Sequence, residues 1–134
     1  MVDVSFPFLM KLILYWIPAL AYNGLIFYLS SLPQSSLVTT IPDEISHFLE
    51  FGFLALLILF GLTKGFSSKI SKKNLFLTIS LSFIIAISDE FHQSFTLSRT
   101  VSLKDILFDL VGSVSFSLII FWLKIDLAKY LRKI

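Results

Sequence analysis

The sequence predicts an all-α membrane protein, a compact bundle of four transmembrane helices. Of its 134 residues, 56% are hydrophobic and only 15% are charged, whereas soluble domains average roughly 45–50% apolar and about 25% charged residues. The mean hydropathy is +0.87. The length suits a single domain, residues 1–134. The apolar blocks are expected to form helices at about 9–30, 43–63, 74–93 and 104–126.

The first apolar block, Leu12–Leu29, contains no charged residue. Within it, the small residues Ala19-Leu20-Ala21 are similar to the cleavage site of a signal peptide. We favour a retained span, because signal peptides have a basic start and a shorter apolar core. Here Lys11 is the only basic residue before the site, and the apolar run continues to Leu29.

The remaining blocks are Ile45–Leu62, Leu75–Phe91 and Ile106–Ile125. Each approaches the ~20 residues that a helix needs to cross a hydrocarbon core of about 30 Å. The middle two blocks are short and carry charges at one end, so a re-entrant segment is the alternative for either. Four spanning helices are the favoured interpretation.

The basic residues predict how the bundle is oriented. With four spans, Lys11, the second loop and the C-terminal tail lie on one side, and together they hold nine of the eleven basic residues. By the positive-inside rule this side is cytoplasmic. We therefore expect a multi-pass protein of the cell membrane with both termini in the cytoplasm. The lipid bilayer is the expected partner, and nucleic acid is not.

The opposite side holds both histidines and seven of the nine acidic residues. A charged group at membrane depth is costly, and it is retained where partners or a wet cavity support it. Helical spacing sorts the polar side chains into three stripes, which should face one another inside the bundle. The stripes are Asp43, His47 and Glu50; Asp89, His92 and Gln93; and Asp105, Asp109 and Gly112. For Asp43 and Asp105, helix capping is an equally good interpretation.

These stripes predict one assembled site near the outer face of the membrane. Its expected ligand-binding residues are His47, Glu50, Glu90, Gln93, Arg99, Asp105 and Asp109. For catalysis, the candidates are His92 as a general base and Asp89 as the carboxylate that orients it, with Asp105 as the alternative carboxylate. A divalent metal is compatible with the surplus of acid, and its candidate ligands are His47, Glu50, Asp89 and His92.

Two motifs carry a resemblance to a known family. The first is Asp43-x-x-x-His47-Phe48 before an apolar helix, with Ser30-Ser31-x-Pro33 ahead of it. The second is Asp89-Glu90-x-His92-Gln93-x-Phe95, followed by Arg99, Ser102, Asp105 and Gly112. Together they resemble the VanZ-like membrane proteins over nearly the whole chain. Two positions depart from that pattern: Glu44 stands where the family commonly has Lys, and Asp109 stands where it often has Asn. Both changes make the expected site more acidic.

The resemblance implies a role in the cell envelope, because the family's namesake is associated with low-level resistance to the glycopeptide teicoplanin. Three hypotheses follow. The protein binds a lipid-linked cell-wall precursor or the antibiotic itself; or it is a membrane-embedded hydrolase or transferase acting on a lipid headgroup; or it is a proton-coupled transporter. The transporter hypothesis ranks last, because the ionisable groups of the spans gather at one end.

Overall fold

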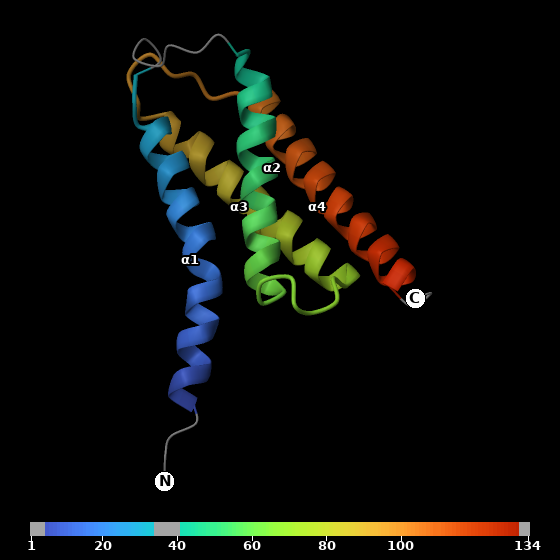
Figure 1. Ribbon diagram of the computed structural model, residues 1–134. Helices are drawn as coiled ribbons and strands as arrows, with labels where there is room; N and C mark the ends of the chain where they lie inside the picture. The colour runs from blue at the N-terminus through green and yellow to red at the C-terminus, as the bar shows by residue number, and fades with distance from the viewer. Residues whose placement is uncertain (1–4, 34–40, 132–134) are drawn as a thin grey trace.

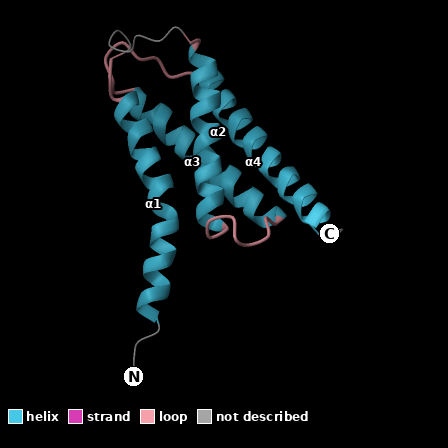
Figure 2. Cartoon of the chain, in the orientation of Figure 1, coloured by secondary structure: helices cyan, strands magenta, loops and turns pink. Residues whose placement is uncertain are grey.

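The computed structural model describes the backbone of residues 5–33 and 41–131, and the side chains of residues 10, 13–33 and 41–124. The described residues form four helices joined by loops and turns (Figures 1 and 2). Each helix is long and apolar enough to cross a membrane, which confirms the predicted fold class. The first helix begins before the expected residue 9, and the last continues past residue 126. The helices are α1 (Ser5–Ser30), α2 (Asp43–Leu62), α3 (Lys72–Gln93) and α4 (Leu103–Leu131).

Helix α2 is the centre of the bundle. It packs against each of the other three helices, most extensively against α4, whereas α1 packs only against α2 and α3 in the described part of the chain. Side chains of α2 supply much of the buried core, including Phe51, Leu54 and Leu59. Figure 1 shows α2 between α1 and α4. The first residues of α2, such as Asp43 and Ile45, remain exposed, and burial begins one turn later at His47.

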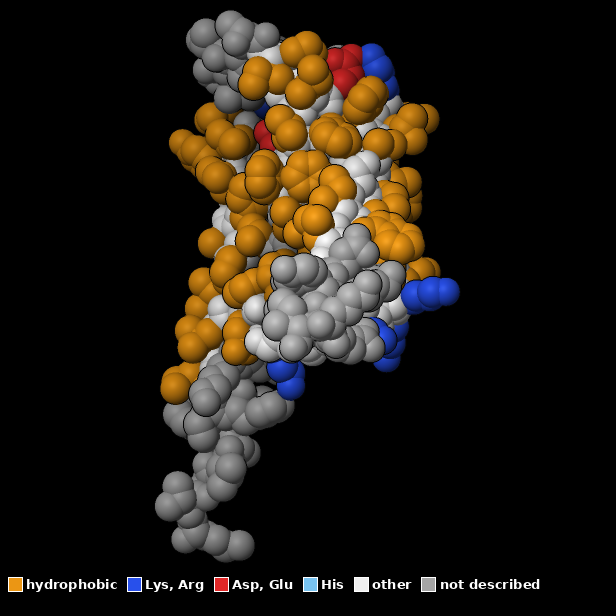
Figure 3. Space-filling model, turned by 45° about the vertical axis from the view of Figure 1, so that its right-hand side comes forward, with side chains coloured by type: hydrophobic (Ala, Val, Ile, Leu, Met, Phe, Trp, Pro, Cys, Tyr) orange, Lys and Arg blue, Asp and Glu red, His pale blue; other side chains and the backbone are white. Residues whose placement is uncertain are grey.

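The outer surface of the bundle is apolar. Leu20, Phe76 and Trp122 are each more than half exposed, and hydrophobic side chains cover the middle of the visible face in Figure 3. Such a surface suits the hydrocarbon interior of a bilayer, where helices satisfy their own backbone hydrogen bonds. The chain is a multi-pass membrane protein with four candidate spans.

A close approach of α2 and α4 depends on two glycines. A Cβ placed on Gly112 of α4 would lie 2.1 Å from the carbonyl oxygen of Phe48 in α2. A Cβ on Gly52 would lie 2.7 Å from the ring of Phe116. Next to Gly112, the hydroxyl of Ser113 donates to the Phe51 carbonyl at 3.2 Å. Small residues allow helices to pack closely in lipid, and here they fix how α4 lies along α2.

The loop between α2 and α3 marks the other end of the bundle. Helix α3 begins with a reciprocal cap. The backbone N–H of Asn74 donates to the Ser71 hydroxyl, and the backbone N–H of Ser71 donates to the side-chain oxygen of Asn74. The ammonium of Lys124 in α4 donates to the carbonyl of Phe66 in this loop at 2.8 Å. The positively charged groups at this end, away from the start of α2, therefore include Lys64, Lys69, Lys72, Lys73 and Lys124.

We expect Gly112→Ala to lower the free energy of unfolding by about 1–3 kcal/mol, the usual cost of overpacking. The clash is with backbone, so a side-chain rotation cannot relieve it. The measurement is denaturant unfolding in detergent micelles. The matched control is Gly24→Ala, because nothing lies within 4 Å of a Cβ at that position. Equal stability of the two variants would contradict the proposed contact.

Candidate functional site

A buried histidine–aspartate pair lies where α2 and α4 begin. His47, one turn into α2, places Nδ1 2.9 Å from Oδ1 of Asp109 in α4. Their exposed fractions are only 5% and 1%. The second carboxylate oxygen of Asp109 has no hydrogen-bond partner. The bond fixes the plane of the imidazole and occupies Nδ1, so Nε2 is the ring nitrogen that remains for a further contact.

Two further carboxylates stand close to His47. Asp43 is the first residue of α2, and Asp105 lies in the first turn of α4. One donor atom from each of Asp43, His47 and Asp105 lies within 4.8 Å of the others. The N-cap interpretation of Asp43 is wrong, because Pro42 occupies that position and α2 has no side-chain cap. Asp105 keeps its position in the first turn, where a carboxylate complements the helix dipole.

A second buried carboxylate, Asp89, connects α1 to α3. Its Oδ1 accepts a hydrogen bond from the Ser30 hydroxyl at 2.6 Å, and its Oδ2 accepts one from the Gln93 amide at 2.9 Å. Only 2% of the residue is exposed. Both oxygens of this carboxylate are thus occupied within the protein, which favours a positioning role between two helices.

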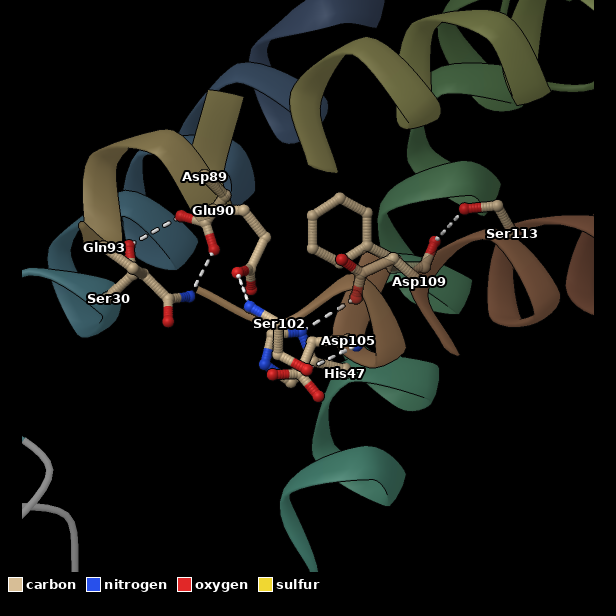
Figure 4. Close-up of polar contacts among 10 residues, drawn as sticks. Ser30, His47, Asp89, Glu90, Gln93, Ser102, Asp105, Asp109 and Ser113 are labelled. Carbon is tan, nitrogen blue, oxygen red and sulfur yellow. Dashed lines mark hydrogen bonds and ion pairs between the residues drawn. The ribbon is translucent and has the colours of Figure 1, made fainter. Parts of the chain in front are cut away.

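The neighbouring Glu90 is buried as well and points toward the start of α4 (Figure 4). One of its oxygens accepts the backbone N–H of Ser102 at 2.8 Å. Its other oxygen, Oε1, has no partner. The Ser102 hydroxyl in turn accepts the backbone N–H of Asp105 at 3.3 Å. Glu90 therefore fixes the residue that caps α4.

His92 is hydrogen-bonded to a serine and not to either candidate catalytic carboxylate. Its Nε2 is 2.8 Å from the Ser31 hydroxyl, and its ring packs on Phe27 with centroids 5.4 Å apart. No hydrogen bond joins the described side chains of His92 and Asp89. The carboxylate that orients a histidine in this structure is Asp109, and the histidine is His47.

Arg99 attaches the loop after α3 to the end of α1. It donates from Nε to the Leu32 carbonyl at 3.3 Å and from Nη2 to the Leu29 carbonyl at 3.4 Å. The hydroxyl of Thr96 adds a bond to the Ser30 carbonyl at 3.2 Å. These bonds leave further guanidinium N–H groups for a ligand, since the group has five.

Polar side chains from α1, α2, α3 and this loop enclose a pocket of about 170 Å³. Asp43, Ser46, His47 and Glu50 form one stripe of α2, and the opposite wall includes Asp89 and Gln93. The full lining is Ile26, Leu29, Ser30, Asp43, Ser46, His47, Glu50, Asp89, Gln93 and Arg99.

The comparison with protein families is decisive for classification. Residues 13–124 match the family model described as VanZ/LLP1, which is well over half of the chain. The chain belongs to the VanZ/LLP1 family. No curated protein and no solved structure matches it. The matched range contains every residue of the pocket.

In this VanZ/LLP1 protein, the expected site residues divide into two groups. Those that line the pocket are His47, Glu50, Asp89, Gln93 and Arg99. Those outside its lining are Glu90, His92, Asp105 and Asp109. Of the four metal-ligand candidates, three line the pocket and His92 does not.

Five pocket residues of the VanZ/LLP1 site are not among the expected binding residues: Ile26, Leu29, Ser30, Asp43 and Ser46. Asp43 is expected only as a member of the α2 stripe. Ser30 belongs to the Ser30-Ser31-x-Pro33 motif. Ser46 falls three residues after Asp43 and thus on the same helical stripe, so spacing alone could have identified it. Serine is common in such helices as a self-satisfied side chain, and this weakens the signal.

We expect a double-mutant cycle on His47→Ala and Asp109→Ala to give a coupling free energy of about 0.5–3 kcal/mol, because each substitution removes the other's buried partner. The measurement is denaturant unfolding in detergent. Glu44 and Lys104 form an exposed ion pair at the same end and serve as the control. Their coupling should be smaller, since water screens it. A buried pair coupled no more strongly than the exposed one would contradict this assignment.

Proposed function

We propose that this VanZ/LLP1 protein is a cell-envelope binding protein whose pocket takes the polar headgroup region of a lipid-linked cell-wall precursor at the outer membrane face. The observation that carries the proposal is the pocket itself. It lies among polar ends of apolar helices and combines the Arg99 guanidinium with Gln93, His47 and two carboxylates of α2, Asp43 and Glu50.

The size of the pocket supports a headgroup over a whole antibiotic. Its volume is about 170 Å³. Pockets that enclose drug-sized molecules measure about 300–1,000 Å³. A phosphate or a single sugar unit fits such a space, while the lipid chain would remain in the bilayer. An effect on glycopeptide susceptibility would then act through the precursor.

The donors and acceptors suit this ligand class. Guanidinium N–H groups of Arg99 can bind phosphate oxygens, which arginine recognises with paired hydrogen bonds. Carboxylates of Asp43 and Glu50 can accept hydrogen bonds from sugar hydroxyl groups. Gln93 already donates to Asp89, so its amide oxygen remains as an acceptor.

The lysines support an outward-facing site. Lys64, Lys69 and Lys72 lie in or next to the loop between α2 and α3, and the Lys124–Phe66 hydrogen bond adds the α4 lysine to that end. The positive-inside rule makes that end cytoplasmic. The pocket then faces the outer side, and both termini lie in the cytoplasm.

The orientation can be tested directly, because the chain has no cysteine. We expect a membrane-impermeant maleimide to label Leu97→Cys in intact cells and Lys69→Cys only after permeabilisation. Both positions are exposed, and they lie at opposite ends of the bundle. The reverse labelling pattern would place the pocket in the cytoplasm and contradict the proposal.

Precursor binding tests the pocket. We expect Glu50→Gln and Arg99→Lys to weaken binding of a polyprenyl-diphosphate-linked precursor about tenfold or more, because a charge-assisted hydrogen bond contributes about 1.5–3 kcal/mol. The measurement is calorimetry on protein in detergent, with an ordinary phospholipid as the comparison ligand. Ser94→Ala is the control, since Ser94 is exposed and outside the pocket. Unchanged affinity in both pocket variants would reject the pocket as the binding site.

The same variants allow a test in cells. A glycopeptide-sensitive host that expresses the protein should lose more susceptibility to teicoplanin than to vancomycin, and Arg99→Lys should reduce this effect. A variant that no longer binds the precursor but changes susceptibility as much as the intact protein does would separate the antibiotic role from the binding role.

A second candidate function is a membrane-embedded hydrolase or transferase acting on a lipid headgroup. The His47–Asp109 pair favours it, because a histidine held by a buried carboxylate is suited to proton transfer. Product formation from the precursor during incubation, abolished by His47→Gln, would support this alternative. Stable precursor in the presence of the intact protein would favour binding alone.

A further inference from the structure

We propose that Asp43, His47 and Asp105 form a binding site for a divalent transition-metal ion, Zn²⁺ or Mn²⁺, at the start of α2 and α4. Asp109 is the positioning residue that orients the histidine. This site differs from the metal-ligand set expected from the sequence. It also stands independently of the headgroup proposal, because it needs no lipid ligand.

The geometry supports a common site for the three side chains. Asp43 and His47 are one helical turn apart, and Asp105 comes from the first turn of the neighbouring helix. Their donor atoms all lie within 4.8 Å of one another. Ligand atoms around one zinc ion are separated by about 3–4 Å, as bond lengths of about 2.0–2.2 Å require. Side-chain rotations that move the donor atoms by about an ångström would bring all three within bonding distance of one ion.

The contact behind His47 is typical of metal-binding histidines. A ligating imidazole usually donates its other ring N–H to a carboxylate, which fixes the tautomer and the direction of the ligating nitrogen. Here Nδ1 contacts Asp109 Oδ1 at 2.9 Å, so Nε2 is the ligand atom. This arrangement is more specific than a group of acidic residues, because the histidine is already oriented.

An independent observation comes from two buried carboxylate oxygens that have no partner. They are Oδ2 of Asp109 and Oε1 of Glu90, on residues that are 1% and 2% exposed. Figure 4 shows the Asp109 carboxylate beside His47 and the Glu90 carboxylate beside Ser102. Buried charge is retained where an opposite charge compensates it. A cation at this position would supply that charge.

Lys104 and Arg99 do not supply it; the ion-pair partner of Asp109 is His47, which carries a positive charge only when it is protonated. Lys104 pairs with Glu44 on the surface, and the hydrogen bonds of Arg99 go to backbone carbonyls. Among the described residues, neither cation forms an ion pair with Asp105 or Asp109. The carboxylates around His47 therefore carry more negative charge than Lys104 and Arg99 balance. A divalent ion can balance the remainder.

The ligand set indicates which ions suit the site. Imidazole binds zinc and related transition metals, and carboxylates also suit manganese, whereas magnesium and calcium prefer all-oxygen surroundings. Three protein ligands leave coordination positions for water or substrate. Because Asp43 and His47 also line the pocket, these positions would lie at its edge.

The earlier candidate set is less suitable in this structure. Both oxygens of Asp89 already accept hydrogen bonds from Ser30 and Gln93. His92 contacts Ser31 and lies outside the pocket lining. Asp43, His47 and Asp105 therefore replace that set as the proposed ligands.

The test is metal binding to the purified chain, prepared with a tag that lacks histidine. Protein stripped with a chelator is dialysed against Zn²⁺ or Mn²⁺, and bound metal is measured by mass spectrometry. We expect one ion per chain, with Mg²⁺ and Ca²⁺ bound much more weakly. His47→Gln and Asp105→Asn should abolish stoichiometric binding. Asp109→Asn should weaken it about 10–100-fold, as loss of a positioning carboxylate does.

Two matched variants serve as controls. Glu44→Gln removes an acid next to Asp43, and His92→Gln removes the other histidine of the chain. Both should keep one ion per chain. Loss of binding in His92→Gln together with retention in Asp105→Asn would overturn the assignment, as would the absence of stoichiometric metal in the intact protein.

A thermal measurement covers variants that fold poorly. Zn²⁺ or Mn²⁺ should raise the unfolding temperature of the intact protein and of both controls. The temperature should not change for Asp43→Asn, whose exposed position at the start of α2 makes it the mildest ligand substitution. Precursor binding measured before and after chelation separates the two proposals. Retained precursor affinity in metal-free protein, together with no metal binding, would reject only the metal site.

Discussion

The close contact between Gly112 and Phe48 is the constraint on which the site depends. Because a single added carbon would lie 2.1 Å from the Phe48 carbonyl, α4 can approach α2 this closely only with glycine there. His47 directly precedes Phe48, and Asp109 lies one turn before Gly112 on α4. The contact therefore sets both the separation and the register that bring Nδ1 of His47 to 2.9 Å from Asp109. A shift along either helix would separate a pair that is almost wholly buried.

The parts of this arrangement that depend on one segment at a time could be predicted from the sequence. Hydropathy over about twenty residues identifies a span, and the intervals between Asp43, His47 and Glu50 place them on one stripe whatever surrounds them. The pairing between helices could not be predicted in this way. Asp89 and His92 are three residues apart, yet packing directs Asp89 to Ser30 and His92 to Ser31. Which carboxylate bonds to which histidine depends on how the helices are rotated and where they touch. The residue intervals within one helix carry no information about either.

The two proposed binding sites meet at Asp43 and His47. The pocket extends from these residues toward Arg99 and Gln93, whereas the proposed ion lies on the side of Asp105 and Asp109. An ion there would place positive charge beside a pocket that has a surplus of carboxylates. Phosphate binding by Arg99 would then be assisted by a second positive centre. Both sites rely on the α2–α4 contact, since it positions His47 for each.

The attachment of the loop after α3 has an evolutionary consequence. Arg99 and Thr96 bond to main-chain carbonyls of Leu29, Ser30 and Leu32, and not to their side chains. Main-chain acceptors remain in place whatever amino acid occupies those positions. The Leu29 side chain on that wall of the pocket can therefore be exchanged by mutation while the loop stays anchored, whereas the Ser30 hydroxyl is needed by Asp89. A protein built in this way can acquire new ligand preferences through single substitutions at the end of α1, without first having to evolve a new way to close its site.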